Sequence, residues 1–81
     1  MKKYVAVFRS RTDVLSFIDD MRTNGQYASA ISTPKEAKIG CGISAEITYA
    51  GIFTAKKLIN KNRYNSFYAI ILIDKNSVRR I

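Results

Sequence analysis

The sequence predicts an α+β fold in which a four-stranded antiparallel sheet carries two helices on one face. The chain has 81 residues, enough for a single domain, residues 1–81, with one thin core. Two stretches place apolar residues at helical spacing, and strand-like stretches precede, separate and follow them. The resulting order is β-α-β-β-α-β, which is typical of a sheet with both helices on the same face. A ligand must then bind at an edge, on an open face or between subunits.

The first predicted strand and helix occupy the start of the chain. Residues 3–8, KYVAVF, are β-branched and aromatic, which is typical of a buried strand. Apolar residues then fall at i, i+3, i+4 and i+7, which is one face of a helix: Val14, Phe17, Ile18 and Met21. Ser10 to Asp13 fits a capping box, with Thr12 as a competing cap, and Asn24-Gly25 ends the helix.

The middle of the chain contains two further predicted strands. Tyr27 to Ser32 predicts a weaker strand, and residues 33–42, which include Pro34, predict a loop. Apolar and polar residues alternate from Ile43 to Tyr49. This period of two indicates a half-exposed strand.

The last third of the chain completes the sheet. Apolar residues recur with helical spacing from Ile52 to Asn62, and the polar side of this helix carries Lys56, Lys57 and Lys61. Phe67 to Ile73 predicts the final strand, and residues 74–81 predict a basic, partly frayed tail. Both helices on one face and a strand order of 4-1-3-2 would make a ferredoxin-like sandwich.

Composition excludes several kinds of site. The chain has no His and one Cys, which excludes serine triads, Cys–His dyads and His-ligated metals within one chain, so no cofactor or metal is expected. A single thiol closes no intrachain disulfide, which favours a reducing cytoplasm. The longest apolar stretch, residues 67–73, is too short to span a bilayer, and no signal-peptide core follows Met1. We therefore expect a cytoplasmic protein that is not an enzyme.

The single cysteine, Cys41, lies between Gly40 and Gly42 at the expected start of the third strand. In the predicted strand order this point lies beside the end of the first strand and the start of the first helix, near Arg9, Ser10 and Arg11. A helix N-terminus and guanidinium groups stabilise a thiolate, and flanking glycines leave the sulfur uncovered. These features suit a sulfur nucleophile or carrier. The alternative is an inert, buried cysteine.

Several segments, in order, resemble the selenium/sulfur carrier protein-like family of small prokaryotic proteins. They are Phe8-Arg9-Ser10, a capped helix, Thr33 to Glu36, and Cys41-Gly42 before an alternating strand. The resemblance covers nearly the whole chain. It implies that Cys41 carries sulfur or selenium as a persulfide or selenosulfide between donor and acceptor proteins, and that the loop around it is shaped by Ser10, Pro34, Lys35 and Gly42.

The chain departs from the family pattern at two points. Lys35 stands where the family usually has Arg, and Lys38-Ile39-Gly40 replaces a Ser-rich approach to the cysteine. Lysine keeps the positive charge without the bidentate fork, so a planar anion would be held less specifically.

A basic module that binds nucleic acid or another protein, without redox chemistry, is the alternative function. The net charge is +8, and a diffuse phosphate-contacting surface would consist of Lys2, Lys3, Arg9, Arg11, Lys56, Lys57, Lys61, Arg63, Arg79 and Arg80. An RNA recognition motif is disfavoured, because the third strand would present Ser44, Glu46 and Thr48 outward instead of aromatic residues.

The open face of the predicted sheet suggests a homodimer. If Val5 and Val7 face the helices, Tyr4, Ala6 and Phe8 face outward and form an exposed apolar face. Contiguous exposed apolar surface usually marks association, so a sheet-to-sheet homodimer is the leading interpretation. The alternative is that the basic tail covers this face.

Overall fold

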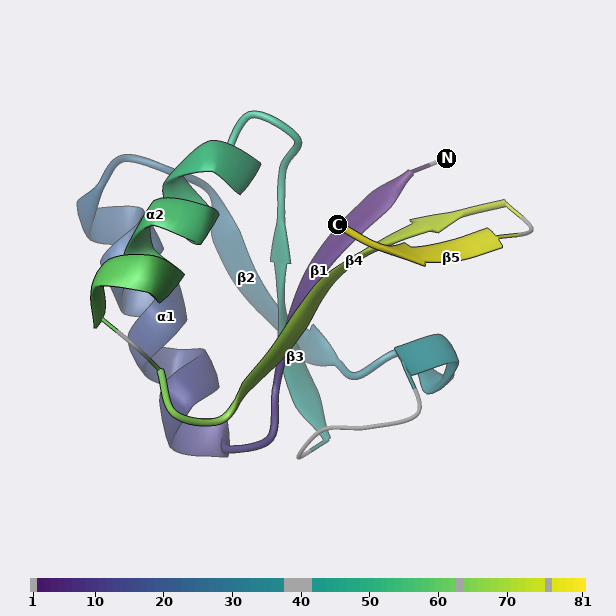
Figure 1. Cartoon of the computed structure of the whole chain (residues 1–81), viewed down its shortest axis with the longest axis horizontal. Helices are drawn as coiled ribbons and strands as arrows, with labels where there is room; N and C mark the ends of the chain where they lie inside the picture. Colours follow the sequence, from purple (N-terminus) through teal and green to yellow (C-terminus); the bar gives the residue numbers. More distant parts are fainter. Residues whose placement is uncertain (1, 38–41, 63, 76) are drawn as a thin grey trace.

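The computed structural model describes residues 2–37, 42–62, 64–75 and 77–81. Within these residues the chain forms two α-helices, one short 3-10 helix and five strands (Figure 1). In chain order they are β1 (Lys3–Phe8), α1 (Arg11–Thr23), β2 (Ala28–Ser32), η1 (Lys35–Ala37), β3 (Ile43–Ile47), α2 (Ile52–Asn62), β4 (Phe67–Asp74) and β5 (Ser77–Arg80). The predicted α+β class and both predicted helices are confirmed.

The strands form one antiparallel sheet in the order β2-β3-β1-β4-β5. β1 lies between β3 and β4, and β2 lies outside β3, as predicted. The predicted total of four strands is wrong, because Ser77–Arg80 pairs with β4 as a fifth strand, with Leu72 opposite Arg79. The sequence Ser-Val-Arg-Arg has only one apolar residue, Val78. Backbone pairing, and not an alternating pattern, therefore makes this strand.

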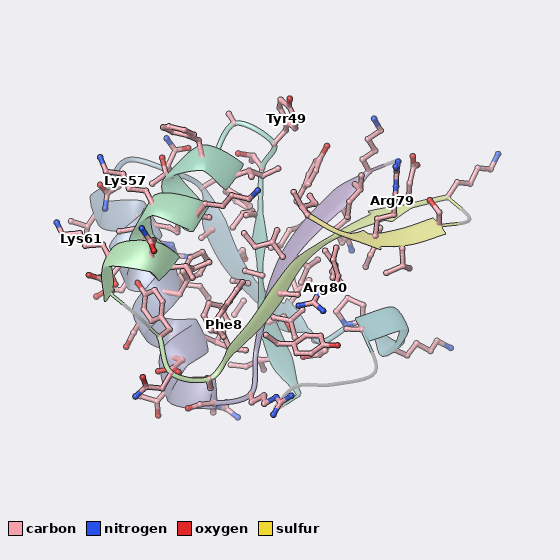
Figure 2. The ribbon with its side chains drawn as sticks, in the orientation of Figure 1. Phe8, Tyr49, Lys57, Lys61, Arg79 and Arg80 are labelled. Carbon is pink, nitrogen blue, oxygen red and sulfur yellow. The ribbon has the colours of Figure 1, made fainter. Side chains whose placement is uncertain are left out.

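The main core lies between the helices and the sheet, and it corrects the predicted orientation of β1. Ala6 and Phe8, predicted to face outward, pack with Phe17 and other apolar residues of α1, and Figure 2 shows Phe8 on the helix side of the sheet. Val5 and Val7, predicted to face the helices, lie on the opposite face. The physical reason is that β1 is buried on both faces. A continuous apolar run does not show which residues face which side.

A second cluster covers the face opposite the helices. Val5, Val7, Ala69 and Ile71 are buried there, and Ala37 of η1 packs against them. Figure 1 shows η1 and the β4–β5 hairpin on this side, away from α1 and α2. The exposed apolar face on which the homodimer prediction depended is therefore not found among the described residues. The basic tail forms β5, which extends the sheet beyond β4.

Tyr64 ties the ends of the two helices to the core. Its hydroxyl donates a hydrogen bond to Asp20 of α1, and Asn62 Nδ2 donates to the same Asp20 oxygen at 3.2 Å. The Tyr64 ring meets the rings of Phe8 and Phe17 edge-on, with centroids 5.6 and 5.7 Å away. Burial, followed by the hydrogen bond to Asp20, raises the pKa of Tyr64 from 10.0 to about 12.

The raised pKa of Tyr64 predicts a loss of stability at high pH. A phenol that ionises less readily in the folded protein stabilises it fully below about pH 10, and this contribution is lost as the pH rises through about 12. We expect Tyr64→Phe to cost about 1 kcal/mol at neutral pH and to remove this part of the alkaline decline. Urea denaturation of both proteins across this pH range measures it. The prediction fails if both proteins lose stability in parallel above pH 10.

Candidate functional site

The end of β1 and the start of β3 lie together at one end of the sheet. β1 and β3 are antiparallel, with Tyr4 opposite Ile47 and Ala6 opposite Ala45. The same register brings Arg9, just after β1, to the end of the sheet where Gly42 precedes β3. Figure 1 shows the start of α1 at this end as well. The structure therefore places Arg9 and Gly42 at the same end of the sheet, near the start of α1.

Gly42 is hydrogen-bonded to Thr33, so the two ends of the loop between β2 and β3 lie together. The Thr33 N–H donates to the Gly42 carbonyl at 3.1 Å, and the Thr33 and Ser44 hydroxyls are hydrogen-bonded at 2.8 Å. Gly42 has a φ of +97°, and an added Cβ would meet nothing within 4 Å. Glycine is therefore required here by backbone conformation and not by lack of room.

The other predicted site residues divide into two groups. Gly40 and Cys41 lie outside the described residues. Pro34 follows Thr33 but lines a shallow pocket with Lys3, at the far end of β1 from Arg9. Lys35 is the exposed first residue of η1. No contact among the described residues therefore places Pro34 or Lys35 beside Arg9.

The start of α1 is held by a hydrogen-bond network instead of the predicted capping box. Ser10 is the N-cap residue but its side chain makes no capping hydrogen bond. Its N–H donates to the Ser66 hydroxyl oxygen at 3.0 Å. Asp13 Oδ2 accepts hydrogen bonds from the Ser66 N–H at 2.9 Å and from the Ser66 hydroxyl at 2.5 Å. The capping-box prediction is wrong because the partner of Asp13 lies far along the chain, in the turn before β4.

Tyr68 and Arg80 belong to this end of the sheet, and sequence reasoning missed their arrangement. The guanidinium carbons of Arg9 and Arg80 lie 5.7 and 5.0 Å from the centroid of the Tyr68 ring. Arg80 also donates from Nη2 to the Tyr68 carbonyl at 3.2 Å, and Figure 2 shows Arg80 beside β4. Within the described residues neither guanidinium forms an ion pair. Two positive charges are therefore held near the end of β1 by cation–π contact.

Over the described ranges, no group of three or more His, Cys, Asp or Glu residues is placed to hold a metal ion. None of the helices in that part of the chain has the length and apolar character needed to cross a membrane.

The fold and this positively charged end of the sheet define a small α+β protein with one cysteine in the segment that precedes β3. Comparison with known families identifies it further. Residues 3–68 match the family described as "Putative Se/S carrier protein-like", and the chain belongs to this family. The match includes Cys41 and ends at Tyr68, so β5 and Arg80 lie beyond it. No curated protein and no solved structure matches the chain.

Proposed function

We propose that this protein is a carrier that holds one sulfur or selenium atom on Cys41 and passes it to a partner protein. Membership of the carrier-like family carries the proposal, because the match spans residues 3–68 and includes the single cysteine of the chain. A carrier performs no turnover of its own, so donor and acceptor proteins are part of the proposal. The cytoplasm is the proposed compartment, since it keeps a free thiol reduced.

Positive charge at the neighbouring end of the sheet supports this role. Gly42, the next residue after Cys41, lies at the end of the sheet that also holds Arg9 and the N-terminus of α1. Arg80 adds a second guanidinium on the Tyr68 ring. Thiolates are the reactive form of cysteine, and they are favoured by positive charges and helix N-termini.

The proposed loading step is an exchange of one sulfur atom. The Cys41 thiolate attacks the terminal sulfur of a persulfide on the donor, a new S–S bond forms on Cys41, and the S–S bond of the donor breaks. The donor leaves as a thiolate, and its former persulfide proton remains on the terminal sulfur. No external oxidant or reductant is needed, because one S–S bond replaces another. Delivery to the acceptor is the same exchange in reverse.

Mass spectrometry of the intact protein tests the proposal. After incubation of the reduced chain with cysteine and a cysteine desulfurase, we expect the mass to rise by one sulfur atom, with the adduct mapped to Cys41. Cys41→Ser should show no adduct. The proposal is overturned if the folded protein gains no sulfur, or if an unfolded control gains as much.

The effect of the Arg9 charge on the reactivity of Cys41 can be measured with a matched pair of variants. We expect Arg9→Ala to slow alkylation of Cys41 at neutral pH by about 2–5-fold, the equivalent of about 0.3–1 kcal/mol for one partly exposed charge. Lys57→Ala removes the same charge from the exposed side of α2 and should leave the rate unchanged. A thiol that reacts only after unfolding would make Cys41 a structural residue, and equal rates in all three proteins would show that the Arg9 charge does not influence Cys41.

A further inference from the structure

The helices leave part of the sheet uncovered between α2 and β4. α1 contacts β1, β2 and β3, and α2 contacts α1. β5 widens the sheet on the other side, beyond β4. Two hollows of about 650 and 310 Å³ lie along this boundary and share Lys56 and Ile81. We call these two adjoining hollows the α2–β4 groove.

Exposed aromatic side chains gather at one end of the α2–β4 groove. Phe53, in the first turn of α2, is 83% exposed and Tyr49 is 75% exposed, and both line the larger hollow. The Tyr49 ring rests against the ring of Tyr4, with centroids 5.8 Å apart. Three of the six large apolar side chains that are exposed in the described chain, Tyr49, Phe53 and Ile81, line this one hollow. Single exposed apolar residues are common, but a cluster beside a groove indicates binding.

The charged side chains around the groove are all positive. Among the described residues that line the two hollows, the charged side chains are Lys2 and Lys56, and none is a carboxylate. Arg79 lies opposite Leu72 in the sheet register, so it is on the groove side of β5. Figure 2 shows Lys57 and Lys61 on the outer side of α2, away from the groove. These side chains suit an occupant that combines flat apolar surface with negative charge.

We propose that the α2–β4 groove binds an unpaired nucleobase together with its phosphate, as presented by single-stranded nucleic acid. The aromatic rings of Phe53 and Tyr49 are largely exposed at the surface. Exposed rings suit stacking against a base better than burial of a peptide side chain. Lys2 and Lys56 then neutralise phosphate charge. This site is independent of the carrier proposal, since the length of β3, five residues or roughly 17 Å, separates Tyr49 from the Gly42 end of the sheet.

Binding of labelled oligothymidylate at low salt, measured by fluorescence anisotropy, tests the groove. We expect Phe53→Ala to weaken binding by at least about 5-fold. Leu15→Ala is the matched control, because Leu15 is also exposed but lies on α1, outside the groove. Lys56→Ala should weaken binding and lower the dependence on salt by about one phosphate contact, whereas Lys57→Ala should do so much less.

Competition with a mononucleotide distinguishes the two sources of the base. Displacement of the oligonucleotide by comparable concentrations of mononucleotide identifies a nucleotide site, and binding of the strand alone identifies a single-strand site. Binding of the strand alone supports the proposal, and a nucleotide site would overturn it. Absence of binding near about 50 mM salt, equal losses for Phe53→Ala and Leu15→Ala, or binding of an acidic peptide but no oligonucleotide would overturn it. Cys41→Ser should bind the oligonucleotide normally, so failure of the carrier proposal and failure of this one are separable.

Discussion

Phe8→Ala is expected to remove a large part of the stability of the folded chain. The Phe8 side chain is fully buried, and its ring lies 5.1 Å from that of Phe17 and 5.5 Å from that of Phe67. Truncation of a buried phenylalanine costs about 3–5 kcal/mol. A domain of this length has a total stability of roughly 4–12 kcal/mol, so this loss would leave a substantial unfolded population.

Urea denaturation followed by circular dichroism measures the effect of Phe8→Ala. Phe53→Ala is the matched control, since the same atoms are removed from a side chain that is 83% exposed. We expect the control to change the free energy of unfolding by less than about 0.5 kcal/mol. A loss below about 1 kcal/mol for Phe8→Ala would show that Phe8 is not at the centre of the core.

Phe8 also shows which parts of the fold the sequence can predict. The strand containing it was evident from its β-branched and aromatic residues, and the α1 stripe from Val14 to Met21 was evident from its period. Which face Phe8 occupies was not, because β1 has apolar residues on both faces and a shift of one residue exchanges them. In β3 the alternation predicted the faces correctly, since Ala45 faces the helices and Ser44 and Glu46 face the other way. The predicted half-exposure is wrong, because Ser44 is buried as well.

The candidate site was predictable only where it depended on strand adjacency. The expected proximity of the third strand's start to Arg9 and Ser10 followed from the order of elements, and the register of β1 and β3 agrees with it. Tyr68 and Arg80 were missed because their arrangement requires β5. A strand held mainly by backbone hydrogen bonds to an edge leaves little trace in side-chain pattern. The groove beside α2 was missed for the same reason, since Arg79 and Ile81 reach it only through that strand.

Asp13→Ala is expected to cost about 2–3 kcal/mol, more than a surface substitution on the same helix. Asp13 accepts hydrogen bonds from the N–H and the hydroxyl of Ser66, and loss of an acceptor leaves a partly buried donor unpaired at about 1–3 kcal/mol. The carboxylate also lies in the first turn of α1, where negative charge contributes about 0.3–1 kcal/mol. Ser66 in turn pairs with the backbone of Arg9 and Ser10, so this network fixes the turn that carries the site residues.

Chemical denaturation at neutral pH compares Asp13→Ala with Asp19→Ala and Asp13→Asn. Asp19 is an exposed carboxylate in the middle of α1, and its replacement should change the free energy of unfolding by about 0.5 kcal/mol or less. Asp13→Asn keeps an oxygen acceptor and loses the charge, so it should fall between the two. If Asp13→Ala costs no more than Asp19→Ala, the bonds from Ser66 do not stabilise the fold, and the turn at Arg9 and Ser10 must be held by the β1–β4 pairing alone.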